Sequence, residues 1–258
     1  MSGKKALIKF DELPLRGSDL KNIPRDQAAF LAVLFCATNE VNLLLRLYSL
    51  YARHPASGSP EALSGQMTQL FLARTLSSKL YEVIELLNGK TSWYRTNDQV
   101  IKIFQEKYSE SLREHSDSDG FAIARTLRND CTSHYSLAAA RKNIESLDDS
   151  LDCTTYLHEN EGNSFSLLGE NVVFNERFRV GRLPGEQDAN EEKLGVWLDW
   201  TIATTAWLKK ISADFAVTVL PDDVQFRLRE NQLHWPDPSY VGDLSRTFAP
   251  VFLRSINQ

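Results

Sequence analysis

The feature that most constrains the fold is the segment 189–218, in which apolar side chains recur at steps of three and four residues. This spacing matches the period of an α-helix, so the segment predicts a long helix with one face buried against other elements. Its apolar positions are Leu194, Trp197, Leu198, Leu208, Ile211 and Phe215. The pattern favours an all-α protein.

Four further segments show helical patterns, at 24–54, 61–88, 97–113 and 120–147. Pro24 stands where a first helical turn tolerates proline, and Pro55 ends the first of these helices. Asn88 and Gly89 form a stop signal for the second, because glycine adopts the left-handed conformation that ends many helices. Together with 189–218, these segments predict an up-and-down helical bundle of about five helices.

The segment 152–180 has a different character. Short runs rich in β-branched and aromatic residues, at 154–157, 165–167 and 172–174, are separated by Asn-, Glu- and Gly-containing turns. Such runs between turn residues are typical of strands. They predict a small β-hairpin or a three-stranded meander inserted into the helical protein.

The predicted organisation is one helical domain, 24–218, that contains this insertion. An extended polar arm, 1–23, precedes the domain, and an irregular tail, 219–258, with one short helix follows it. The formal net charge of −5 argues against a protein that coats nucleic acid nonspecifically, since such binding needs many cations. It does not exclude a small basic pocket.

The three cysteines are widely spaced and form no Cys/His cluster, so the sequence indicates no metal site and no disulfide framework. The N-terminus lacks the long apolar core of a signal peptide. The most apolar uninterrupted run, 28–37, is too short to span a bilayer. These observations predict a cytoplasmic protein with no membrane partner.

One decapeptide, Thr-Leu-Arg-Asn-Asp-Cys-Thr-Ser-His-Tyr at 126–135, carries the clearest chemistry. Arg128 is a permanent cation whose donors suit phosphate oxygens, and His134 exchanges a proton near neutral pH. On an ideal helix the two residues lie about 120° apart around the axis and roughly 9 Å apart along it. A local distortion of the helix, or a second copy of it across a two-fold axis, would bring them together.

The same residues also allow a structural interpretation. On the helical wheel His134 lies within the apolar arc, where a histidine is often a hydrogen-bonded core residue, and Arg128 lies at its edge. Arg128 would then pair with Glu82, Glu85 or another acid across the bundle. The bare spacing has little weight, because Arg227 and Arg229 also precede a histidine, His234, at a similar distance.

With Asn129 after Arg128, and His134 six positions beyond that arginine, the chain resembles the HEPN family of small all-helical domains. The family signature is an arginine, a polar residue and then a histidine four to six residues after the arginine. The order of two long helices before the motif helix adds to the resemblance. It covers roughly 24–150; the insertion 152–180 and the tail depart from the family pattern.

The resemblance implies a metal-independent RNA endonuclease of toxin or defence type, which acts as a homodimer in the cytoplasm and needs no cofactor. Its partners would be RNA or a nucleotide and an antitoxin protein. His134 would act as general acid or base, Arg128 would stabilise phosphoryl charge, and Asn129 would orient the phosphate. Arg125 and Tyr135 are outside the signature; Arg125 would add a phosphate contact and Tyr135 would stack on a base.

Two other functions remain open from the sequence. In the first, the same cleft holds a nucleotide or an RNA end without cleaving it. In the second, the chain is a structural partner in a defence complex, and Arg128 and His134 only stabilise the fold.

Overall fold

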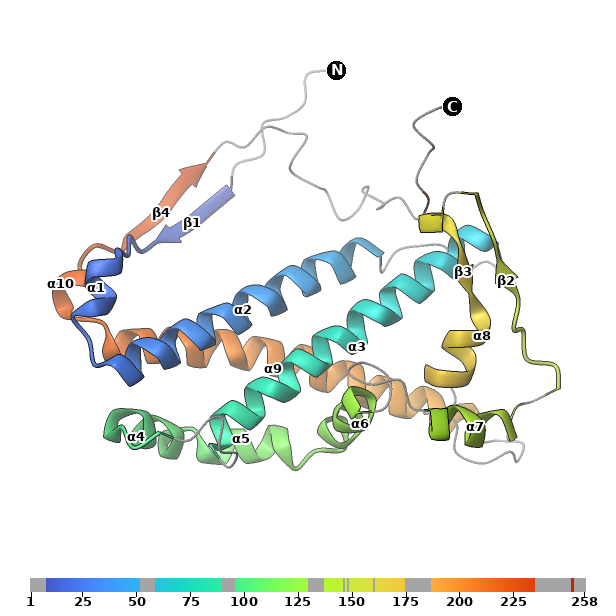
Figure 1. Ribbon diagram of the computed structural model, residues 1–258. Coiled ribbons are helices and arrows are strands. Elements are labelled where there is room, and N and C mark those ends of the chain that lie inside the picture. The colour runs from blue at the N-terminus through green and yellow to red at the C-terminus, as the bar shows by residue number, and fades with distance from the viewer. Residues whose placement is uncertain are drawn as a thin grey trace, which may run out of the picture.

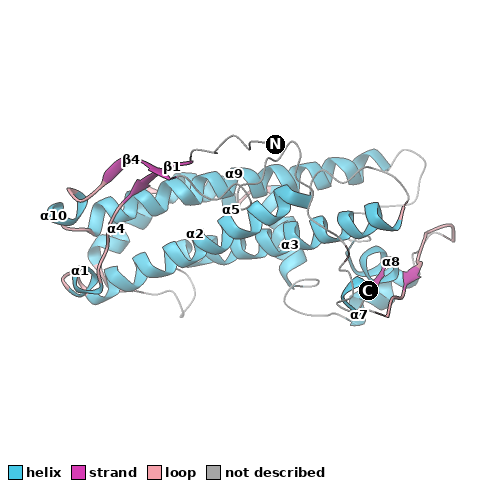
Figure 2. Cartoon of the chain, turned by 90° about the horizontal axis from the view of Figure 1, so that it is seen from above, coloured by secondary structure: helices cyan, strands magenta, loops and turns pink. Residues whose placement is uncertain are grey.

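The structure of the chain, a computed structural model, describes residues 8–51, 59–89, 96–129, 137–145, 147, 149–159, 161–174, 187–234 and 252. These residues form an all-α fold, as the sequence predicts, and they include two small two-stranded sheets. Three long helices make the trunk of the molecule: α2 (Arg25–Tyr51), α3 (Pro60–Asn88) and α9 (Gln187–Val219). Figures 1 and 2 show them running along the length of the molecule.

The apolar faces of these helices form one core. Leu34 of α2, Leu80 of α3 and Phe215 of α9 are fully buried in it. Phe215 meets Phe30 edge to face, with ring centroids 4.9 Å apart, an arrangement that aromatic pairs favour. The hydroxyl groups of Thr38 and Ser212 lie 2.9 Å apart and link α2 to α9 across the core.

The ends of α3 are set by local sequence. The Ser59 hydroxyl accepts a hydrogen bond from the Ala62 N–H, and Pro60 occupies the first turn. Gly89 ends the helix in the left-handed region, at φ 58°, which glycine adopts without a steric penalty. The predicted boundaries of this helix are therefore confirmed.

By length and composition, α2 is the one helix in the described parts of the chain that would suffice to cross a membrane. A window of 18 residues has a mean hydropathy of 1.8, and 22% of that window is buried. The uninterrupted apolar run 28–37 is too short to span a bilayer, whereas the whole of α2 passes this test. In the structure α2 packs against α3 and α9, so it serves as a helix of the trunk.

The predicted helix 97–113 consists of two helices, α4 (Gln99–Lys107) and α5 (Ser109–Ser116). The chain departs from helical geometry at Tyr108, which has φ −100° and ψ 7°. The ring of Tyr108 packs on Phe104 at 4.9 Å, and its hydroxyl donates a hydrogen bond to the Asp214 carboxylate of α9. These tertiary contacts hold Tyr108 at the break, and no local sequence pattern signals them.

The predicted helix 120–147 also differs. It is described as α6 (Asp119–Leu127) and α7 (Leu137–Glu145), with Arg128 and Asn129 in a π-helical turn after α6. The helical wheel drawn from sequence therefore does not extend past Leu127. Leu137, which that wheel places on the apolar arc, is 64% exposed.

The insertion contains the predicted hairpin. Strand β2 (Thr155–Tyr156) pairs antiparallel with β3 (Phe165–Ser166), in a register that sets Tyr156 opposite Phe165. The alternative prediction of a three-stranded meander, with a third strand at 172–174, is wrong. A short helix, α8 (Leu167–Gly169), is followed by a π-helical segment, η3 (Glu170–Phe174).

Two contacts hold the η3 segment in a helical conformation. The Asn143 side-chain amide of α7 donates a 2.7 Å hydrogen bond to the Val172 carbonyl. The Arg74 guanidinium of α3 makes two hydrogen bonds, of 2.6 and 2.8 Å, to the Glu170 carboxylate. Both partners are distant in sequence, so the strand-like composition of 172–174 is overridden by tertiary contacts.

The arm and the tail are more regular than predicted. Strand β1 (Ile8–Glu12) in the arm pairs antiparallel with β4 (Arg229–His234) in the tail, and short helices α1 (Gly17–Lys21) and α10 (Asp222–Gln225) lie beside them (Figure 1). Arg227 donates a 2.9 Å hydrogen bond to the buried Asp19. Pairing across more than 200 residues leaves no local signal in either segment.

Candidate functional site at Arg128

The site begins with the packing of α6 between α3 and α9. Gly120 allows this close approach, because a Cβ atom there would lie 2.3 Å from the Cβ of Trp200. One residue later, the Phe121 ring stacks on Tyr81 of α3, with centroids 5.1 Å apart and planes 16° from parallel. The first turn of α6 is thus fixed, its last turn carries Arg125, and Arg128 caps its C-terminal end.

Arg128 reaches from the end of α6 back to α3. Its Nε and Nη2 atoms lie 2.9 and 2.7 Å from Oε1 of Glu82, and Nη1 donates a 3.1 Å hydrogen bond to Oδ1 of Asn129. The guanidinium carbon lies 5.6 Å from the centroid of the Tyr81 ring, within cation–π range. Arg128 therefore pairs with Glu82, the acid that the sequence raised as one of its alternative partners.

This pairing orients Arg128 without enclosing it. The side chain of Arg128 is 32% exposed and that of Glu82 is 38% exposed. A guanidinium has five N–H donors, and three of them have partners among the described residues. The other two have no partner in the described part of the chain, and two is the number that a bidentate contact to a phosphate uses.

The Tyr81 ring packs against the guanidinium of Arg128 and is itself uncharged. Burial, and then the nearby Glu85 carboxylate, raise the pKa of Tyr81, although the positive charge of Arg128 opposes the shift. The phenol consequently stays protonated throughout the physiological range. Its ring offers Arg128 a neutral aromatic face and does not add to the negative charge of Glu82.

The structure brings three of the five predicted site residues together. Arg125 lies one turn before Arg128 on the exposed side of α6, and Asn129 is exposed and contacts Arg128 directly. The other two, His134 and Tyr135, lie outside the described residues. Arg128 and Asn129 themselves form the π-helical turn, a distortion often found at functional sites.

Tyr81 is the participant that sequence reasoning missed. It lies next to Glu82 in α3, but the spacing of α3 alone does not show that its ring meets both Phe121 and Arg128. Among the described residues, no group of three or more His, Cys, Asp or Glu side chains lies close enough to hold a metal ion. The chemistry available at this point is that of a cation beside a carboxylate.

No protein-family model, no curated protein sequence and no solved structure matches the chain. The HEPN resemblance consequently rests on the motif at 126–135 and on the order of the helices.

Proposed function

We propose that the chain is a metal-independent RNA endonuclease of toxin or defence type, in which Arg128 and His134 act on a phosphodiester. The observation that supports this most is the state of Arg128. Its guanidinium is held by Glu82 and Tyr81, yet its side chain is 32% exposed and two of its N–H donors have no partner among the described residues. An arginine that is fixed in this way is suited to charge that develops on phosphoryl oxygens.

In the proposed reaction His134 removes the proton from a ribose 2′-hydroxyl, and that oxygen attacks the adjacent phosphorus. The bond from phosphorus to the 5′-oxygen breaks, and a protonated imidazole returns a proton to the leaving oxygen. Arg128 and Asn129 hold the two non-bridging oxygens. Arg125 contacts a neighbouring phosphate, and Tyr135 stacks on a base.

We propose further that the active form is a homodimer. Leu137 and Ile144 of α7 are 64% and 57% exposed, and they are seven residues apart, so they share one face of the helix just after the motif. Exposed apolar residues of this size favour burial against a partner. A second copy on this face would bring two motif segments near one another, and Leu137→Lys with Ile144→Lys would give a monomer in light scattering.

The proposed setting is the cytoplasm, where the RNA substrate is present. In a toxin system, an antitoxin protein would restrain the enzyme by covering the exposed side of Arg125 and Asn129. Copurification of such a partner with the wild-type protein, and its loss with Arg125→Glu, would support this.

The proposed activity is tested by incubating the purified protein with single-stranded and structured RNAs in EDTA. We expect cleavage that falls at least about a hundredfold in Arg128→Ala, since one preorganised donor contributes about that factor, and in His134→Ala, since general acid–base catalysis contributes at least as much. Arg46→Ala, which removes an exposed arginine of α2, is the matched control and should leave the rate unchanged. Cleavage that persists in both motif variants with folding intact would refute the proposal.

A second candidate is a module that holds RNA or a nucleotide without cleaving it. The observation that favours it is the carboxylate of Glu82 on Arg128, because it offsets part of the charge that catalysis would use. RNA binding that is lost in Arg128→Ala, with no cleavage by the wild type, would identify this function. Unfolding of both motif variants would instead point to the structural role.

A further inference from the structure

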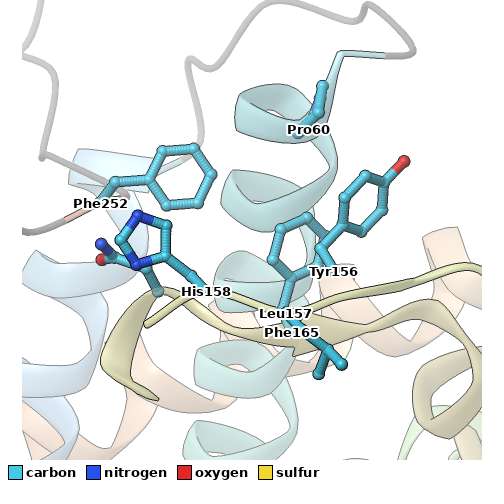
Figure 3. A pocket seen from close by; sticks show the side chains of 7 residues that line it. Pro60, Tyr156, Leu157, His158, Phe165 and Phe252 are labelled. Atoms are coloured by element: carbon cyan, nitrogen blue, oxygen red, sulfur yellow. The ribbon is translucent and has the colours of Figure 1, made fainter. Parts of the chain in front are cut away.

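A cavity of about 450 Å³ lies between the β2–β3 hairpin and the start of α3, far from Arg128 (Figure 3). Pro60 closes one side, and the hairpin and Phe252 form the others. The volume lies within the usual range for small-molecule pockets. Seven residues line it, namely Pro60, Tyr156, Leu157, His158, Asn163, Phe165 and Phe252.

Three aromatic rings dominate the wall. Tyr156 and Phe165 are a cross-strand pair with centroids 4.5 Å apart and planes 16° from parallel. Phe165 and Phe252 lie 6.3 Å apart with planes 29° from parallel. Nearly parallel rings beside an open space favour a flat ligand, because such a ligand stacks on a ring face that the neighbouring ring leaves uncovered.

The other lining residues are the apolar Pro60 and Leu157 and the polar His158 and Asn163, and none of these four carries a fixed positive charge. His158 contributes an imidazole and Asn163 a side-chain amide, groups that by type both donate and accept hydrogen bonds, and both residues also have interactions within the protein. The described residues that line the cavity include neither lysine nor arginine. This composition favours a neutral heteroaromatic ring and gives no reason for a phosphate to bind.

The hairpin holds this arrangement in place. The hydroxyl groups of Thr155 and Ser166 lie 2.8 Å apart across the strands. The Ser164 hydroxyl accepts a 2.9 Å hydrogen bond from the His158 N–H and so closes the turn. A binding surface built on such a turn loses little conformational freedom when a ligand enters.

We propose that this cavity binds a nucleobase, through stacking on Tyr156, Phe165 and Phe252. It is a second site, because Pro60 and Glu82 are about 33 Å apart along α3 at 1.5 Å per residue. The inference deepens the proposed function, on which it rests for its ligand: the cavity would hold a base of the RNA several nucleotides from the phosphodiester at Arg128. Free nucleosides and bases within a strand share this chemistry.

The test is titration of the whole protein with adenosine, AMP, ribose 5-phosphate and a short single-stranded RNA, followed by calorimetry. Adenosine and AMP should bind about equally and ribose 5-phosphate should not bind. Adenosine binding should also change little with salt, since no counterion is released. Phe165→Leu should weaken adenosine binding about tenfold, as expected for loss of one stacking contact.

The matched control is Phe226→Leu, which removes a phenylalanine that is 88% exposed and lies outside the cavity. Unchanged adenosine affinity in Phe165→Leu, binding of ribose 5-phosphate, or a preference for a proline-rich peptide over adenosine would overturn the proposal. If Phe165→Leu fails to fold, Tyr156→Leu provides the same comparison.

These experiments also distinguish the proposed base site from the proposed nuclease activity. Adenosine binding should be unaffected by Arg128→Ala, whereas RNA should bind less tightly to Phe165→Leu with an unchanged cleavage rate at saturation. If the protein binds adenosine but cuts no RNA, the proposed base site stands and the proposed nuclease activity is refuted. If it cuts RNA but binds no adenosine, the nuclease activity stands and the base site is refuted.

Discussion

The two ends of α3 carry opposite kinds of chemistry. Near its C-terminal end, Glu82 and Tyr81 hold the guanidinium of Arg128 at the surface of the trunk. At its N-terminal end, Pro60 faces stacked aromatic rings of the hairpin, with no lysine or arginine among the described lining residues. The first region suits charge and the second suits flat, neutral rings. If both proposals hold, α3 sets the distance between a phosphate site and a base site.

The two regions also depend on different contacts. The Arg128 end is part of the trunk core, through the Tyr81–Phe121 stack and the close approach at Gly120. The hairpin end is attached to the trunk in part by the pair between Arg74 and Glu170, whose side chains are only 13% and 14% exposed. Each region can therefore be disturbed separately.

The largest expected effect is detachment of the hairpin. Arg74→Met leaves the Glu170 carboxylate largely buried without its cation, which should cost about 3 kcal/mol of unfolding free energy. Hydrogen exchange should accelerate in β2, β3 and η3, and adenosine binding should fall, while the α6 amides stay protected. Chemical denaturation and exchange measured by mass spectrometry report both effects.

A matched control for that variant lies on the same helix. Lys79→Met removes an exposed pair with Glu40, whose side chains are 45% and 46% exposed, so it should cost less than about 1 kcal/mol. Equal losses in Arg74→Met and Lys79→Met would show that burial does not distinguish the two pairs. The hairpin would then be held by something other than Glu170.

An intermediate effect is expected from Glu82→Gln, which acts on the other region. Glutamine keeps an acceptor for Arg128 but loses the charge, so kcat should fall about tenfold through poorer orientation of the guanidinium. KM should not rise, because a negative charge near the substrate phosphate is removed. Adenosine binding by Glu82→Gln should stay as in the wild type. A rise in KM with unchanged kcat would mean that Glu82 serves in substrate binding and does not position Arg128.

The smallest effect is a pH dependence of stability that arises where α5 packs on α9 of the trunk. Burial lowers the pKa of His115, with a smaller opposing influence from Glu114, and its Nδ1 lies 3.0 Å from the Thr204 hydroxyl of α9. The unfolded chain then binds a proton more readily than the folded one, so stability should be full above the ordinary histidine value of 6.5 and fall as the pH drops toward the lowered pKa.

Denaturation curves across this pH range check that expectation. His115→Gln removes the titrating group, so the part of the pH dependence due to this residue should disappear. An equal slope in wild type and variant would contradict the assignment to His115.

The sequence predicts the trunk well because periodicity and stop signals are local. The α3 boundaries follow from Pro60 and Gly89, and α9 follows from its three- and four-residue apolar steps. The β1–β4 sheet and the helical η3 could not be predicted this way, since both depend on partners far away in the chain.

The candidate site, too, can be predicted from sequence only in part. The residue types at Arg125, Arg128 and Asn129 are visible in sequence, and so is the acid Glu82. The ring of Tyr81 beneath Arg128, and the break in helical register at Arg128, arise from packing of α6 on α3. The aromatic cavity leaves no local signal in the sequence, because Pro60, Phe165 and Phe252 belong to three separate segments.

The most direct test of the central claim is analysis of the ends that the protein leaves on a single-stranded RNA cleaved in EDTA. Mass spectrometry should find a 2′,3′-cyclic phosphate on one fragment and a 5′-hydroxyl on the other, because the 2′-oxygen is the attacking group. DNA of the same sequence should stay intact, and Arg128→Ala should give neither end. Cleavage of the DNA, or RNA fragments that carry 5′-phosphates, would contradict the proposed roles of Arg128 and His134.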